Sequence, residues 1–260
     1  MKIASFNVNS INARLPRILD WFDRAKPDVC VLQEIKCVDE KFPYAEFEDR
    51  SYNIHVHGQK TYNGVALLSK HPLDELRRGL PGDPSDDQSR YVEAVVTPKD
   101  ERPVRVAGVY APNGNPAPGP KFDYKLDWLK RLKTHAEELL SYEEALVIAG
   151  DYNIIPQAAD VHDPKAWAAD ALFLPESRAA YREILNLGFT DAIRQVNPEK
   201  TLYTFWDYQA GAWEKDHGIR IDHFLLSPQA ADRLKDVGVD RSERGKEKPS
   251  DHVPVWVDLK

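Results

Sequence analysis

The feature that most restricts the fold is a series of short apolar runs spread over the whole length of the chain. Each has the length and composition of a buried strand. The runs occupy residues 3–6, 29–32, 64–68, 91–96, 104–110, 146–149 and 224–226. A further run at 253–259 places Val and Leu at alternate positions, which is typical of a half-buried strand that closes a sheet.

Helical spacing of apolar residues is confined to three stretches between these runs. The stretches are Leu15, Ile18, Leu19 and Phe22, then 126–140, and then Tyr181, Ile184 and Leu185. So many strands with so few helices do not suit a regular alternation of strand and helix. We therefore expect an α/β protein in which two mixed, mostly antiparallel sheets pack together and helices cover their outer faces.

The chain is expected to form a single domain over residues 1–260. It is 42% hydrophobic, ample for a large core, and no Gly/Ser-rich linker or charge block divides it. The proline-rich stretch 112–120 is interpreted as an ordered, irregular surface loop. A disulfide between Cys30 and Cys37 is conceivable, but so large a domain does not need one, and reduced buried thiols are expected.

The terminus and the charge bear on location and partners. The first residues are too few and too polar for a signal peptide, and no apolar run approaches the roughly 20 residues that span a bilayer. We expect a soluble cytoplasmic protein with no membrane partner. The formal charge of −7 argues against a protein that binds only a nucleic-acid backbone. It is compatible with a nuclease whose carboxylates surround a metal.

Polar residues follow the apolar runs at the points where the strands end. They are Asn7, Glu34, Asn113, the Asp151-Tyr152-Asn153 triplet, Asp222 and the Asp251-His252 pair. Turns favour Asp and Asn, so any one of them has an ordinary structural explanation. Because packed sheets bring strand ends to a common rim, we expect the set to converge on one site.

The chemistry of this set favours a hard divalent cation. Carboxylate oxygens suit Mg²⁺ or Mn²⁺, whereas a Zn²⁺ site would need clustered Cys or His. A His with a separate carboxylate can act as a general base or as a donor to the transition state. The pattern predicts metal-assisted hydrolysis of a phosphodiester.

Seven segments carry a family resemblance, in the family's order and over nearly the whole chain. They are 32–37 (Leu-Gln-Glu-Ile-Lys-Cys), 64–69, 109–113, 150–153 (Gly-Asp-Tyr-Asn), 204–208 (Thr-Phe-Trp-Asp-Tyr), 220–222 and 250–254 (Ser-Asp-His-Val-Pro). The segments at 150–153 and 250–254 are similar to the wide endonuclease/exonuclease/phosphatase superfamily. Those at 32–37 and 204–208 are narrower, and with them the chain resembles bacterial exonuclease III and the related AP endonucleases.

The resemblance implies a DNase I-like, four-layered α/β sandwich with its active site at one rim. It implies one or two Mg²⁺ ions, with Mn²⁺ as a substitute, held by Glu34 and Asn7, with Asp251 as a further ligand or supporting group. Asp151 would orient or deprotonate the attacking water, and Asn153 would hold the water or the phosphate. Asp151, Asn153 and His252 would also border the metal. His252 would contact the scissile phosphate with Asp222 as its partner, and Tyr110 would donate to the phosphate or the leaving group.

The resemblance also implies substrate contacts. Asn113 and Arg90 match contacts to the DNA, and Lys36 is a plausible phosphate contact. Phe205, Ile219 and Ile221 fall where the family forms an apolar pocket for a flipped-out abasic sugar, although the two isoleucines could equally be core residues. Trp206 would either contact DNA or support this pocket.

The implied function is a monomeric base-excision-repair nuclease that acts on double-stranded DNA with abasic sites or blocked 3′ ends. It would incise 5′ to abasic sites, degrade DNA from 3′ to 5′ and clean 3′ ends. One alternative is a superfamily phosphodiesterase for a non-DNA phosphoester, which should lack the narrower segments. The other is a non-catalytic DNA-binding protein, which should have lost a central ligand.

Overall fold

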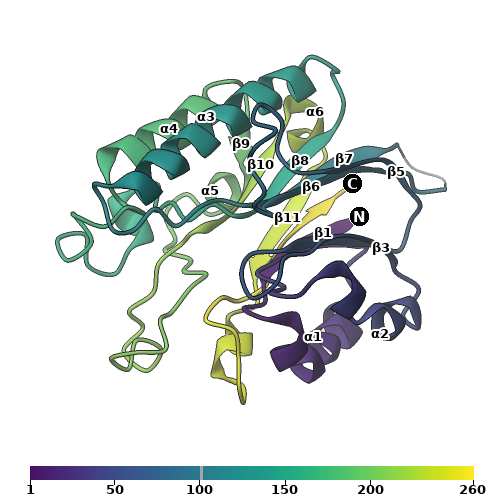
Figure 1. Ribbon diagram of the computed structural model, residues 1–260, viewed down its shortest axis with the longest axis horizontal. Coiled ribbons are helices and arrows are strands. Elements are labelled where there is room, and N and C mark those ends of the chain that lie inside the picture. The colour runs from purple at the N-terminus through teal and green to yellow at the C-terminus, as the bar shows by residue number, and fades with distance from the viewer. Residues whose placement is uncertain (100–101) are drawn as a thin grey trace.

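Two six-stranded sheets packed face to face form the framework of the protein (Figure 1). The structure is a computed structural model that describes residues 1–99 and 102–260. The first sheet has the order β11 (Leu234–Val239), β12 (Val255–Leu259), β1 (Lys2–Asn7), β2 (Val29–Gln33), β4 (Val65–Ser69), β3 (Asn53–His57). The second has the order β5 (Leu73–Arg78), β6 (Tyr91–Val96), β7 (Val104–Tyr110), β8 (Leu146–Asp151), β10 (Asp222–Leu226), β9 (Thr190–Asp191).

Both sheets are mixed, and their register aligns the strand ends that carry polar residues. β1 runs parallel to β2 with Asn7 opposite Gln33, and β7 runs parallel to β8 with Tyr110 opposite Asp151. β10 is antiparallel to β8, so that its first residue, Asp222, also pairs with Asp151. The carboxyl ends of four strands and the start of a fifth therefore share one rim of the sandwich.

Helices cover the outer faces of the two sheets and complete four layers. The first sheet packs against α1 (Ile11–Ala25) and α2 (Tyr44–Glu48), and the second against α3 (Pro120–Leu140) and α4 (Pro175–Leu185) (Figure 1). The remaining helical turns are α5 (Ala192–Val196), α6 (Pro228–Ala231) and the 3₁₀ turns η1 (Asp39–Lys41), η2 (Ala158–Asp160) and η3 (Arg241–Gly245). The predicted four-layered sandwich is confirmed.

The core between the sheets is rich in β-branched residues, which pack well on pleated surfaces. Val31 of the first sheet and Val92 of the second both press on Gly108 of β7, where an added Cβ would lie 3.0 Å and 3.1 Å from their methyl groups. This contact lets the sheets approach closely behind the rim.

The predicted strands and the three long helices are confirmed, and stretch 112–119 is irregular until α3 begins at Pro120. Cys30 and Cys37 are free and buried, as expected. Sequence reasoning missed the four edge strands β3, β5, β9 and β11. β5 has no buried residue and β11 has one, β9 is two residues long, and β3 contains an Asn and two His, so none forms an apolar run. Among the described residues, no helix combines the length and apolarity needed to cross a membrane.

A buried ionic network lies behind the rim. Arg220 Nε contacts Asp160 Oδ1 at 2.7 Å, and its Nη1 contacts Asp191 Oδ2 at 2.8 Å. The same Nη1 donates to Nδ1 of His223 at 3.1 Å, so the Nε2 of His223 must carry the proton that it shares with the carbonyl of Ile154 at 2.9 Å. Burial, together with the charge of Arg220, lowers the pKa of His223 to about 4.

This pKa predicts an acid-sensitive contribution to stability. His223 is completely buried, and its pKa falls from 6.5 when unfolded to about 4 when folded. Its neutral form therefore stabilises the fold above pH 6.5, and the contribution is lost as the pH falls toward 4, by roughly 3 kcal/mol. In urea titrations across this range, His223→Gln should lose less stability on acidification than the wild type. Equal losses would contradict the prediction.

Candidate active site

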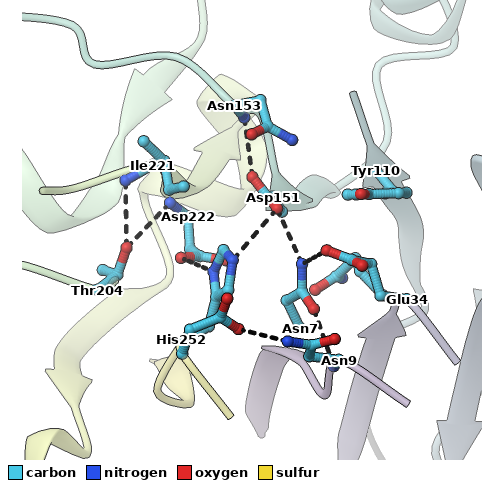
Figure 2. A network of polar contacts seen from close by, with 12 residues as sticks. Asn7, Asn9, Glu34, Tyr110, Asp151, Asn153, Thr204, Ile221, Asp222 and His252 are labelled. Atoms are coloured by element: carbon cyan, nitrogen blue, oxygen red, sulfur yellow. Dashed lines mark hydrogen bonds and ion pairs between the residues drawn. The ribbon is translucent and has the colours of Figure 1, made fainter. Parts of the chain in front are cut away.

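The predicted polar residues converge at the rim, each placed by the end of a strand. Figure 2 shows Asn7 from β1, Asp151 from β8 and Asp222 from β10 around one centre, with Glu34 just after β2 and His252 just before β12. Thr204 holds the start of β10 in place, because its hydroxyl accepts from the N–H groups of Ile221 and Asp222 at 3.1 Å and 3.2 Å. The two sheets thus contribute facing halves of the site.

Asn7 links two carboxylates across the gap between the sheets. Its Nδ2 donates to Glu34 Oε1 at 2.9 Å and to Asp151 Oδ2 at 3.0 Å. Lys36 Nζ pairs with Glu34 Oε2 at 2.8 Å and donates to Asn9 Oδ1 at 2.6 Å. Burial works against ionisation of Glu34, but Lys36 and Asn7 outweigh it and hold its pKa below the ordinary value. Lys36 therefore stabilises a carboxylate, a role different from the predicted phosphate contact.

His252 lies between two buried carboxylates. Its Nδ1 is 2.9 Å from Asp222 Oδ2, and its Nε2 is 3.6 Å from Asp151 Oδ2 (Figure 2). Burial lowers the pKa of His252, but the charges of Asp222 and Asp151 more than offset this and raise it above the ordinary value. Burial and the charge of Asp222 raise the pKa of Asp151, against the opposing effect of His252. The trio therefore favours an imidazolium whose Nδ1 donates to Asp222, while its Nε2 lies at ion-pair distance from Asp151.

The loops after β7 and β8 contribute two asparagines, Asn113 and Asn153, to the site. Asn153 adopts the left-handed region at φ 49°, its N–H donates to Asp151 Oδ1 at 2.8 Å, and its Nδ2 donates to the carbonyl of Ala111 at 2.9 Å. Its Oδ1 accepts from Asn113 Nδ2 at 3.3 Å. This arrangement orients one oxygen of Asp151 and leaves the exposed side chain of Asn113 at the cavity.

Tyr110 and Arg90 lie together beside Glu34. The guanidinium of Arg90 stacks 4.7 Å from the centre of the Tyr110 ring and donates to the carbonyl of Tyr110 at 3.2 Å. Burial and the charge of Glu34 raise the pKa of Tyr110 well above its usual value, so the hydroxyl stays a donor. Arg90 does not line the cavity and instead supports Tyr110.

The cavity at this rim has a volume of about 330 Å³ and two chemically different walls. The polar wall contains Glu34, Asp151, Asp251 and His252 with Tyr110, Asn113 and Asn153. The apolar wall contains Trp167, Leu172, Phe205 and Ile221. One charged wall can hold a phosphate with a metal, and the other can hold an adjoining apolar group.

Two predicted substrate contacts lie behind this cavity and not in it. Trp206 is completely buried, with its indole N–H on Asp216 at 3.0 Å and its ring against Trp213. Ile219 is also completely buried, in the cluster that backs Phe205 and Ile221. Burial therefore argues against direct DNA contact by Trp206, and for Ile219 it agrees with the alternative of a core residue.

The donor set fits a hard divalent cation. Glu34, Asp151 and His252 each offer a ligand atom, and these atoms lie within 4.8 Å of one another. The two carboxylates are the suitable ligands, because the imidazolium of His252 has no nitrogen lone pair to offer a metal. Asn7 is oriented as a donor to both carboxylates, and its Oδ1 accepts from Asn9 N at 3.1 Å. Asp251 stands apart from the cluster and accepts from Asn9 Nδ2 at 3.1 Å.

Sequence reasoning missed several residues of the site. Asn9 connects Asp251 with Lys36, and it was findable because it lies two positions beyond Asn7 on the same segment. Asn115 and Asp170, which bond to each other at 3.1 Å, and Trp167 also line the cavity. They come from irregular segments, where no periodicity points to a site.

Comparisons with known proteins agree with this geometry. The profile of the Endonuclease/Exonuclease/phosphatase family matches residues 4–252. Exodeoxyribonuclease III of Haemophilus influenzae is 35% identical, with the whole of both chains covered, and DNA repair nuclease APEX1 of Danio rerio is 30% identical, with 100% of this chain and 82% of that protein covered.

Solved structures extend the likeness. The 3′ phosphatase NExo from Neisseria, solved with a product DNA hairpin, superposes with a TM-score of 0.96 at 40% identity, covering 100% of this chain and 99% of that one. An AP endonuclease from Archaeoglobus fulgidus gives a TM-score of 0.94 at 36% identity, with the same coverage. With full-length relatives, a shared fold and the motifs at the rim, the chain belongs to the Endonuclease/Exonuclease/phosphatase family, in the group of exonuclease III and the AP endonucleases.

Proposed function

We propose that this protein is a divalent-metal-dependent DNA phosphodiesterase of base-excision repair. It incises 5′ to abasic sites, degrades duplex DNA from the 3′ end and removes 3′ blocking groups. The observation that carries the proposal is the unbroken chain of contacts Asp222–His252–Asp151–Asn7–Glu34 beside a cavity with one polar and one apolar wall. The names of the relatives, which include an exodeoxyribonuclease, a 3′ phosphatase and an AP endonuclease, support DNA as the substrate.

Glu34 and Asp151 would hold the metal, which we propose to be Mg²⁺ with Mn²⁺ as a substitute. The bound cation would supply charge stabilisation for the phosphoryl oxygens. Lys36 keeps Glu34 ionised and correctly turned for this task. Asp251 and Asn9 support this half of the site from its edge.

The chain's own groups would perform the remaining chemistry. The His252 imidazolium, oriented by Asp222, faces the cavity and can donate to a non-bridging phosphate oxygen as negative charge grows there. Asp151, fixed by Asn7 and the N–H of Asn153, is placed to orient and deprotonate a water. The protonated Tyr110 can donate to the phosphate or the leaving oxygen.

The apolar wall would select the sugar. A deoxyribose without its base is already unstacked and is easily extruded from the duplex. Phe205, Ile221, Leu172 and Trp167 offer it a small apolar surface, which Ile219 supports from behind. Asn113 would contact the DNA near the reacting phosphate, and Arg90 would act indirectly by holding the ring of Tyr110. We propose a monomer that acts on DNA in the cytoplasm.

The proposal predicts metal-dependent incision of damaged duplex. With Mg²⁺, the purified protein should cut a duplex that carries one abasic-site analogue and leave a 3′-hydroxyl, and a chelator should abolish the cut until Mg²⁺ is restored. A duplex with a 3′-phosphate at a nick should be cleaned by the same preparation. A covalently closed, undamaged circular duplex, which has neither a lesion nor a 3′ end, and a single-stranded RNA serve as controls. Folded protein that cuts none of the DNA substrates with either Mg²⁺ or Mn²⁺ would refute the proposal.

A further inference from the structure

Lys125 occupies an unusual position for a cation. It lies on α3 on the side that faces the second sheet, has no exposed surface, and has the buried side chains of Phe122, Trp128 and Leu129 beside it on the helix. Among residues 1–99 and 102–260, no carboxylate forms an ion pair with its Nζ, whose partners are backbone carbonyls. Because burying an amino group is costly, an apolar side chain would suit this position better if it served packing alone.

The amino group of Lys125 donates hydrogen bonds to two backbone carbonyls of the active site. Nζ donates to the carbonyl of Asn113 at 3.0 Å and to that of Asn153 at 2.5 Å. These residues lie on separate loops, after β7 and after β8, and their side chains meet at 3.3 Å in the cavity. One side chain from the helix layer therefore joins both loops directly behind the residues that face the substrate.

The loop after β7 is shaped around the Lys125 stem. Gly114 has φ +90°, a conformation that other residues rarely adopt, and a Cβ there would lie 2.7 Å from Lys125 Cδ. The close contact fixes the position of Asn113, the preceding residue. Asn153 is likewise in the left-handed region, and its N–H holds Asp151 Oδ1. A small displacement of either loop would therefore reach the group that orients water.

The protonation state of Lys125 does not decide these contacts. Burial lowers its pKa to about 7, while the charges of Asp151 and Asp170 act in the opposite direction. Both bonds use only two N–H groups, which an amine and an ammonium each provide.

We propose that Lys125 is a positioning residue that sets the side chains of Asn113 and Asn153 relative to Asp151, without touching the substrate. The inference deepens the proposed function and rests on it. Misplacement of a catalytic group by about 1 Å costs on the order of 100-fold in rate. Loss of Lys125 should therefore lower kcat.

Lys125→Met retains the volume of the stem and removes both N–H donors. We expect kcat for abasic-site incision to fall about 10- to 100-fold with little change in KM. Lys130→Met, which removes an exposed lysine of the same helix, is the matched control and should keep wild-type values. The same Lys125→Met change in a background that carries both Asn113→Ala and Asn153→Ala should cost less than about threefold, because both side chains that it positions are already absent.

Two measurements separate this inference from the function on which it rests. The ¹⁵N–¹H signals of the Asn113 and Asn153 side-chain amides should shift or broaden in Lys125→Met but not in Lys130→Met, whether or not DNA is cut. If the methionine variant does not fold, Lys125→Gln, which keeps a donor nitrogen on a shorter stem, should show an intermediate loss of kcat. Unchanged amide signals in folded Lys125→Met, or an equal loss of kcat with and without the two asparagine side chains, would overturn the inference.

Discussion

Asp151→Asn is expected to slow phosphodiester cleavage by about 10³- to 10⁴-fold. The substitution removes a metal-binding carboxylate oxygen and the acceptor for a proton of water. It also places an amide N–H₂ where Asn7 Nδ2 and His252 Nε2 already point as donors, at 3.0 Å and 3.6 Å from the present oxygen. The amide would therefore turn away from its working orientation, and single-turnover rates on the abasic duplex would measure the loss.

The same variant should be at least as stable as the wild type. Burial and the neighbouring Asp222 raise the pKa of Asp151, so its ionised form costs folding free energy at neutral pH. A neutral amide removes that cost, and we expect this gain to exceed the loss of the hydrogen bond from Asn7. A variant that is more stable and less active than the wild type indicates that the replaced residue serves catalysis at the expense of stability. Urea unfolding at neutral pH tests this half of the prediction.

Glu93→Gln is the matched control for loss of a buried carboxylate. Glu93 is 2% exposed, lies on the same sheet, and pairs with Arg105 and His135 away from the cavity. We expect this variant to lose stability and to keep its kcat at a temperature where it remains folded. Comparable kcat losses in both variants would show that Asp151 acts through general stability, and the assignment of its role would be wrong.

The parts of the site that could be predicted from the sequence are those attached to regular strands. Asn7, Glu34, Asp151 and Asp222 follow or begin buried runs, and pairing of those runs aligns them automatically. The two packed sheets could be predicted for a related reason, because the apolar residues of each run are buried only when a second sheet faces them.

The remaining parts depend on tertiary packing that local patterns do not encode. Trp206 follows the pocket residue Phe205, yet a reversal of side-chain direction puts it in the interior on Asp216. Arg90 has the charge for a phosphate contact, but its stacking on Tyr110 is visible only in three dimensions. Lys125 lies on an amphipathic helix, and only the fold shows that it reaches two loops from inside.

His252→Ala is the second large effect, with an expected loss in rate of about 10²- to 10³-fold. The imidazolium is the positive side chain next to Asp151 and Asp222, and its removal takes away the donor that faces the developing phosphoryl charge. Its KM for DNA should change much less than kcat, since charge on the phosphate grows mainly in the transition state. His55→Ala, which removes a 6%-exposed histidine that bonds to the carbonyl of Arg77, is the control and should keep its kcat.

In contrast to Asp151→Asn, this variant should be destabilised, by about 3–5 kcal/mol, because two carboxylates that are each 1% exposed lose the cation between them. Because the two substitutions are expected to change the free energy of unfolding in opposite directions, a variant that carries both is informative. Adding Asp151→Asn to His252→Ala removes one of the two stranded charges and should restore part of the lost stability, although cleavage stays at the level of the worse single variant. Strictly additive free energies of unfolding would mean that the two groups do not interact, and the imidazolium-centred trio would have to be abandoned.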